Sequence, residues 1–350
     1  MHIYIHIPFC RQKCTYCKFA LTPIFTDIQK RRYLSYLQNE IIEWIKTWTN
    51  IFPQTIYFWW GTPSILSPKE LSSILELFPK EWREEITLEA NPEDITEEYI
   101  DTLQGIWINR ISLGIQTLNS QSLKTIHRSS VDTIYRALDI LKKKNFPNIN
   151  IDLILWLPHV AYWETHRALT ELHKSYPITH TSIYLLEDET YPTDWKEATI
   201  SIDKMQQEYV TINEYLAELW WNHYEVSNWS RPWYESKHNQ SYWNHSNYRW
   251  FWLAASSYIN WKRWTNSPSF SGYYRWERID EETLTEEQKD IEHLMFSLRT
   301  SGIPLSKLTQ EQISILQSHI QDGYIEKKEG VFSITSSWIF LIDHIMSQLI

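Results

Sequence analysis

Glycine is the residue that this sequence most conspicuously lacks. It occurs 7 times in 350 residues, whereas an ordinary globular chain of this length contains about 25. Tryptophan is correspondingly abundant, with 20 copies, so the two residues together come close to the number expected for glycine alone. Glycine normally fills turns with positive φ and places where the backbone approaches a ligand closely. Such positions must here be filled by something else.

Other deficits exclude whole classes of protein. Three cysteines are too few for the disulfide framework of a small secreted protein, which uses even numbers. No apolar run reaches the ~18–20 residues of a transmembrane helix, and the first residues enter a strand pattern without a signal peptide. The formal net charge of −10 argues against nucleic acid as a partner and against general binding to anionic membranes, although peripheral membrane contact stays open. We expect a protein of the reducing cytoplasm.

All three cysteines lie in one short loop. Cys10, Cys14 and Cys17 form a C-x3-C-x2-C array directly after the strand-like alternation of residues 3–7. Three thiolates are one fewer than an iron–sulfur cluster usually has, so a [4Fe–4S] cluster held by them keeps one iron open for another ligand. A zinc site, which normally wants four ligands, and three unrelated thiols are the alternatives.

The first half of the chain alternates between strand and helix patterns. Apolar strand segments are followed by segments with helical spacing of apolar residues, which predicts an α/β fold with a parallel sheet and right-handed crossovers. Six strands suit a partial, open relative of the (β/α)8 barrel, with its site at the carboxyl ends of the strands. The predicted strands are 3–7, 55–58, 86–89, 110–113, 149–155 and 180–185, and the helices are 27–45, 68–78, 96–103, 131–143 and 163–173.

The pattern changes after residue 187. A helix at 203–219 leads into an aromatic and polar stretch without clear periodicity, and residues 285–350 show a helix, a turn, two further helices, a hairpin around Gly330 and a last helix. That order resembles a small winged-helix-like module. We therefore predict three parts, 1–187, 188–275 and 276–350.

Several ordered motifs carry a family resemblance. The cysteine spacing resembles that of the radical S-adenosylmethionine (SAM) superfamily, in which SAM chelates the open iron of the cluster. The segments IHIPFCRQKCTYCKF, GTPS, EANP, SLGIQ, YEVSN and HNQSYW resemble the oxygen-independent coproporphyrinogen III oxidase group, and within it the HemW heme-chaperone branch. The resemblance implies a partial (β/α)6 radical SAM barrel with a small C-terminal winged-helix-like domain.

The resemblance also implies a set of cofactor-binding residues. Cys10, Cys14 and Cys17 would hold a [4Fe–4S] cluster. The residues implied to contact or flank SAM are Tyr4, Tyr16, Trp60, Gly61, Thr62, Glu89, Gln116, Arg128 and Asp152, and each alone could equally be an ordinary barrel residue. His238, in a motif associated with heme, would ligate heme iron through its imidazole, although a hydrogen-bonding role is the alternative.

The branch within the group depends on position 19. The porphyrinogen oxidases extend the loop with a fourth cysteine, whereas this chain has Phe19. The resemblance therefore favours a heme chaperone that transfers heme to an acceptor such as a respiratory enzyme. The alternative is oxidative decarboxylation of coproporphyrinogen III, so whether the protein is an enzyme stays open at this point.

Tryptophan stands at many positions where the family has glycine. These positions are Trp59, Trp60, Trp107, Trp156, Trp233, Trp250, Trp252 and Trp338, whereas Trp243 is expected to be a genuine tryptophan. Replacing the smallest side chain by the largest would leave overlap or disallowed backbone angles at each turn. Our hypothesis is that the organism reads UGA as glycine. The alternative is a decayed paralogue that has lost SAM binding.

Overall fold

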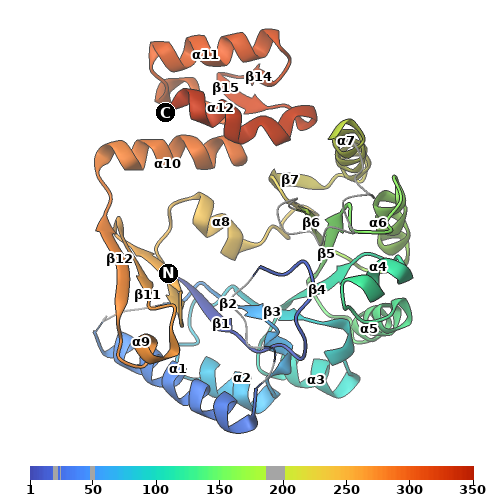
Figure 1. The fold of residues 1–350 in the computed structure, drawn as a ribbon, viewed down its shortest axis with the longest axis vertical. Helices are drawn as coiled ribbons and strands as arrows, with labels where there is room; N and C mark the ends of the chain where they lie inside the picture. The colour runs from blue at the N-terminus through green and yellow to red at the C-terminus, as the bar shows by residue number, and fades with distance from the viewer. Residues whose placement is uncertain (19–22, 24, 48–51, 187–201) are drawn as a thin grey trace.

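The predicted parallel sheet is confirmed. The computed structural model describes residues 1–18, 23, 25–47, 52–186 and 202–350. Six parallel strands lie side by side in chain order, and helices cover the outer side of the curved sheet (Figure 1). The strands are β1 (His2–Ile7), β2 (Thr55–Gly61), β3 (Glu85–Ala90), β4 (Arg110–Gln116), β5 (Ile149–Leu155) and β6 (His180–Leu185). The helices between them are α1 (Asp27–Thr47), α2 (Pro68–Leu75), α3 (Glu97–Gly105), α4 (Ser120–Thr125), α5 (Val131–Lys143) and α6 (Glu164–Ser175), with short 3-10 turns η1 (Pro63–Ile65) and η2 (Pro92–Asp94).

Helix α5 shows how the sequence produces these elements. Ser130 caps its start by accepting a hydrogen bond from the backbone N–H of Thr133 at 3.3 Å, as N-cap serines commonly do. Ile134, Leu138 and Leu141 then recur at helical spacing and are buried, so one face of the helix packs on the sheet. Burying a leucine side chain of this kind contributes roughly 1.5–3 kcal/mol.

The sheet is wider than the sequence predicts. Strands β7 and β8 extend it beyond β6, while β9 pairs in parallel with β1 and begins a second extension that ends at β12. These segments lie in the aromatic stretch that lacks periodicity, which is why they were not predicted. The added elements are α7 (Ile202–Glu218), β7 (Asn222–Glu225), β8 (Asn228–Ser230), α8 (Lys237–Trp243), β9 (Tyr248–Phe251), β10 (Ser256–Ile259), β11 (Lys262–Asn266), α9 (Phe270–Tyr273) and β12 (Arg278–Thr283).

The C-terminal region forms a small body of its own, drawn in orange to red in Figure 1. Leu298, Leu316 and Phe332 belong to its separate apolar cluster, and its order agrees with the expected winged-helix-like module, except that one of the two further helices is only a 3-10 turn. The elements are α10 (Glu286–Arg299), β13 (Ile303–Pro304), η5 (Leu305–Lys307), α11 (Gln310–Gln321), β14 (Ile325–Lys328), β15 (Val331–Ile334), η6 (Ser336–Leu341) and α12 (Ile342–Leu349).

The predicted division into three parts stays a prediction. The main sheet crosses both predicted boundaries, because β8 pairs with β6 and β12 pairs with β11. The C-terminal body contacts the barrel through α7, where Asn213 Nδ2 donates to Ser336 Oγ at 3.0 Å. It also contacts α8, where Trp243 packs edge-on against Phe296 with ring centroids 5.5 Å apart.

Candidate cofactor site at the carboxyl ends of the strands

A cavity of about 630 Å³ opens at the carboxyl ends of the parallel strands. Its volume falls within the roughly 300–1,000 Å³ of small-molecule sites. The loop after β1 supplies the three cysteines and Tyr16, and the ends of β2 to β6 supply the other walls. The predicted residues that line it are Cys10, Cys14, Cys17, Tyr16, Gly61, Thr62, Glu89, Gln116, Arg128 and Asp152. The chain thus brings together side chains that lie up to 142 positions apart, since 152 and 10 are both present.

The cysteine loop is fixed by the turn that follows β2. Thr62 donates its backbone N–H to the carbonyl of Phe9 at 2.8 Å and its hydroxyl to Cys10 Sγ at 3.3 Å. Cys10 is buried, and burial raises the pKa of its thiol to about 11. Cys14 and Cys17 are half-buried. Gly61 must be glycine, because its φ is +61° and an added Cβ would lie 2.1 Å from the carbonyl oxygen of Ile7.

The three thiols do not converge as the ligands of a single ion do. Within the described ranges no three histidine, cysteine, aspartate or glutamate side chains are grouped tightly enough to hold one metal ion. In a [4Fe–4S] cluster each thiolate binds a different iron, so the sulfurs need not meet at one point. The arrangement therefore favours a multinuclear cluster over a zinc ion.

Arg128 places a fixed positive charge beside the loop. Its guanidinium donates to Asn91 Oδ1 at 2.7 Å and to the Gly114 carbonyl, and it lies 3.9 Å from Cys14 Sγ. Burial alone would lower the pKa of Arg128, but the neighbouring Tyr16 and Cys14 raise it above its ordinary value. Gly114 makes room for this side chain, since a Cβ there would lie 2.7 Å from Nη2. A buried cation held in this way suits a carboxylate or an anionic cluster.

Two acidic side chains face the cavity from neighbouring strands of the sheet. Burial, with a further contribution from Asp152, raises the pKa of Glu89 well above its ordinary value, and burial also raises the pKa of Asp152. Glu89 accepts a hydrogen bond from the Tyr57 hydroxyl at 3.3 Å, and Asp152 accepts one from Ser112 at 2.9 Å. A cationic ligand would stabilise the charged forms of both. The site therefore offers acceptors for an ammonium or a sulfonium on one side and a cation for a carboxylate on the other.

Comparisons with known proteins identify the family. Residues 4–190 match the model of the radical SAM superfamily. The chain is 36% identical over 320 residues to the heme chaperone HemW of Lactococcus lactis, covering 87% of this chain and 83% of that protein. It is 30% identical over 331 residues to HemW of Synechocystis, covering 87% of this chain and 79% of the relative. The chain belongs to the HemW family of radical SAM proteins.

The fold of this HemW-family chain also matches a solved enzyme. The Escherichia coli coproporphyrinogen III oxidase, described as a radical SAM enzyme, superposes with a TM-score of 0.83 over 99% of this chain and 89% of that one. The two sequences are 19% identical, so the match establishes a common fold. Phe19, on which the predicted choice between the two branches rests, lies outside the described residues.

Two residues predicted to flank SAM do not line the cavity. Tyr4 is fully buried and stacks on Trp250 with ring centroids 4.2 Å apart. Trp60 packs against His6 at 4.8 Å, and Trp59 rather than Trp60 reaches the cavity wall. The prediction assigned these positions by motif order, whereas successive side chains of a strand point to opposite faces of the sheet.

His238 is in the wrong place for the predicted heme ligand. Its side chain is fully buried at the amino ends of the strands, opposite the cysteine loop. Nδ1 lies 2.7 Å from Thr55 Oγ1 and Nε2 lies 2.7 Å from the Tyr242 hydroxyl, so both ring nitrogens already have partners. Burial lowers the pKa of this imidazole well below its ordinary value. The structure corrects the prediction, because an axial ligand needs a nitrogen that faces the iron.

Asn91 is a cavity residue that the sequence did not single out. Its amide oxygen accepts from Arg128, and its Nδ2 donates to Thr62 Oγ1 at 3.3 Å. It therefore connects the arginine to the turn that holds Cys10. The motif EANP contains it, and its position one residue after β3 is a signal that strand-end reasoning could have used.

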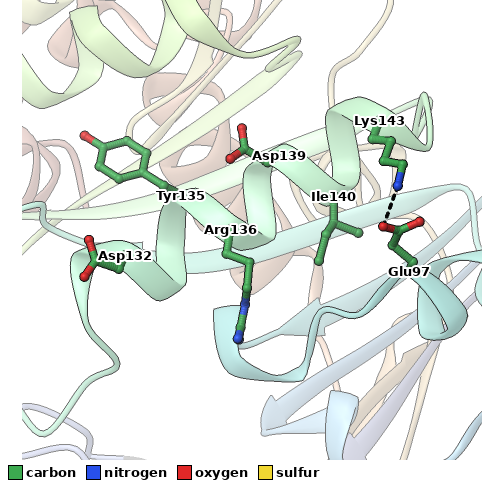
Figure 2. Close-up of a pocket in the computed structure, with 7 residues that line it drawn as sticks. All are labelled: Glu97, Asp132, Tyr135, Arg136, Asp139, Ile140 and Lys143. Carbon is green, nitrogen blue, oxygen red and sulfur yellow. Dashed lines mark hydrogen bonds and ion pairs between the residues drawn. The ribbon is translucent and has the colours of Figure 1, made fainter.

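A second hollow carries no comparable chemistry. It lies on the outer face of α5, far in the fold from the cysteine loop, and Figure 2 shows Glu97 and Lys143 paired across it. Surface ion pairs of this kind stabilise a protein little. Among the described parts of the chain, no helix is long and apolar enough to cross a membrane.

Proposed function

We propose that this protein is a heme chaperone of the HemW type. It binds a [4Fe–4S] cluster and SAM, holds heme and transfers it to an acceptor protein in the cytoplasm, such as a respiratory enzyme. The observation that carries the proposal is the cysteine loop opening onto a cavity walled by a buried cation and two buried acids, in a chain of the HemW family.

Cys10, Cys14 and Cys17 would hold the cluster. Their loop is anchored on both sides, by Thr62 at Cys10 and by the Cys17 N–H donating to the Cys14 carbonyl at 3.1 Å. Arg128 offsets the negative charge that thiolate ligands bring. When bound, such a cluster supplies an electron at its open iron.

SAM would occupy the rest of the cavity. Glu89 and Asp152 suit its positively charged groups, and Arg128 suits its carboxylate. Gln116 adds an amide that lines the same wall. The backbone of Gly61 allows close approach to the loop, which is the role of glycine at such turns.

The heme-binding part of the proposal rests on the family. The relatives are named heme chaperones, and the burial of His238 leaves the iron ligand to be assigned by experiment. Hemin titration of the purified protein is the direct test. We expect a saturable Soret band and transfer of the bound heme to an apo-hemoprotein, and a protein that binds no heme would contradict the proposal.

The same preparation separates the chaperone from a decarboxylase. The reconstituted protein is incubated anaerobically with SAM, a reductant and coproporphyrinogen III. A chaperone leaves the porphyrinogen unchanged, whereas formation of protoporphyrinogen would overturn the pure-chaperone proposal. The Cys14→Ser variant is the control, because any radical chemistry requires the cluster.

A further inference from the structure

Tryptophan occupies backbone conformations that bulky residues avoid. Among the described residues, ten tryptophans have a positive φ, and no tyrosine or phenylalanine does. Positive φ brings Cβ against the backbone, so it favours glycine and, less often, asparagine or aspartate. Tryptophan should therefore be among the rarest residues there. The ten are Trp60, Trp82, Trp107, Trp156, Trp163, Trp220, Trp233, Trp252, Trp261 and Trp276.

Helix ends give the first matched comparison. At the end of α11 the N–H of Gly323 donates to the carbonyl of Ile320 at 3.1 Å, and the N–H of Tyr324 donates to that of His319 at 2.9 Å. This pair of bonds is the Schellman motif, whose left-handed residue is usually glycine. Gly323 has a φ of +77°.

The same motif ends α3 and α7 with tryptophan in the glycine position. At α3 the N–H of Trp107 donates to Gln104 at 3.1 Å and that of Ile108 to Leu103 at 3.0 Å. At α7 Trp220 takes this place with a φ of +61°. The hydrogen bonds demand the left-handed conformation, whatever side chain is attached.

Two hairpins give the second comparison. The loop between β14 and β15 is Glu329-Gly330, and the loop between β10 and β11 is Asn260-Trp261. Both residues of each loop have positive φ, which is the type I′ turn that favours the dipeptide Asn-Gly. Replacing Trp261 by glycine would produce that dipeptide.

The side chains offer no compensation for this strain. Trp107, Trp220 and Trp233 are 76%, 85% and 90% exposed, so their rings gain little from packing. Inside the barrel the opposite problem arises. Trp60 and Trp252 lie 4.8 and 5.4 Å from the ring of His6, whose two nitrogens are buried and have no hydrogen-bond partner among the described residues. Such burial is costly, and glycine at 60 and 252 would open space beside the imidazole.

We propose that all ten positions are glycine in the protein that its own cells make. The organism reads UGA as glycine, and the standard genetic code writes these codons as tryptophan. This inference rests on backbone geometry and not on the proposed function. Trp229 is a contrasting case, because its φ is not positive, it is fully buried and its Nε1 donates to Asn213 at 2.9 Å. It and Trp243 are genuine tryptophans.

The codons and the native peptides test the proposal together. We expect UGA at all ten positions and UGG at 229 and 243, and tandem mass spectrometry of the protein from its own cells should read glycine at the ten positions. UGG at those positions, or tryptophan in the native peptides despite UGA, would overturn it. Heme binding and cofactor content do not enter this test, so failure of the proposed function leaves its outcome unchanged.

A recombinant comparison tests the geometric argument separately. The triple variant Trp107→Gly, Trp220→Gly, Trp233→Gly removes three exposed rings from left-handed positions, and we expect its thermal unfolding midpoint to rise by several degrees. Tyr234→Gly is the matched control, since this aromatic neighbour has no positive φ, and there glycine should lower the midpoint. A lower midpoint for the triple variant would contradict the claim that these positions require glycine.

Discussion

The two ends of the parallel sheet use the same kinds of residue for different purposes. At the amino ends Glu85 accepts hydrogen bonds from the backbone N–H groups of Lys237 and His238, at 3.0 and 3.1 Å. At the carboxyl ends Glu89, on the same strand, faces the cavity together with Asp152. One end satisfies its polar groups within the chain, whereas the other leaves charge available to a ligand. Motif membership alone therefore does not distinguish a site from a core.

The largest expected effect concerns the cluster. Cys14→Ser replaces a thiolate ligand by a hydroxyl, and because Cys14 is half-buried the fold should survive. We expect almost complete loss of bound iron and sulfide, and of the broad visible absorbance, after anaerobic reconstitution. The exposed neighbour Lys13 provides the control, and Lys13→Ala should load normally. Full iron content in the serine variant would remove the cysteine loop from the comparison.

The next largest effect lies at the opposite end. His238→Ala deletes a fully buried ring and leaves Thr55 and Tyr242 each without a hydrogen-bond partner, which should lower the free energy of unfolding by about 2–4 kcal/mol. Urea denaturation measures this loss. Heme bound per folded molecule should stay unchanged, so a shifted Soret band in a folded His238→Asn variant would restore the histidine as an iron ligand.

The sequence predicted the barrel better than its edges. Strands β1 to β6 are buried on both faces and have apolar runs that mark them clearly, as parallel strands do. Strands β7 to β12 are short and lie among aromatic residues without alternation, so no pattern indicated that they pair with β6 and β1. Pairing between segments far apart in the chain depends on tertiary packing, which local periodicity does not contain.

The site shows the same limit. Cysteine spacing and strand-end position predicted the cavity residues correctly where the side chain follows the end of a strand, as for Gln116 and Asp152. Tyr4 and His238 lie within or beneath the sheet, and there the motif could not tell which way the side chain points. The contacts that bury His238 come from residues more than 150 positions away in the sequence.

The two glutamates of β3 offer a matched test of intermediate size. Glu89→Gln removes a charge from the cavity, and because a hydrogen bond to a charged group contributes about 1.5–3 kcal/mol, we expect SAM affinity to fall roughly 10- to 100-fold. Anaerobic equilibrium dialysis measures it. Glu85→Gln should instead lower the free energy of unfolding and leave SAM affinity unchanged. The reverse pattern would contradict the assignment of the two ends.

The smallest effect is a dependence of stability on pH. Burial, followed by His2 and Arg110, lowers the pKa of His238 well below its ordinary value of 6.5, whereas Glu85 and Tyr242 contact it without restoring the charge. The folded state therefore stays neutral while the unfolded state takes up a proton below pH 6.5, so stability falls as the pH decreases through that value. The loss is at most about 1.4 kcal/mol per pH unit for each histidine.

Urea unfolding at pH 7, 6 and 5 measures this slope, and His238→Gln is the matched variant because glutamine does not titrate. We expect the free energy of unfolding of the variant to start lower and to fall less steeply between pH 6.5 and 5. His2 titrates in the same direction, since burial lowers its pKa to about 4, so part of the slope should remain. Equal slopes would mean that His238 gains its proton alike in both states, and the amino end would then no longer differ from the cavity in how it holds its polar groups.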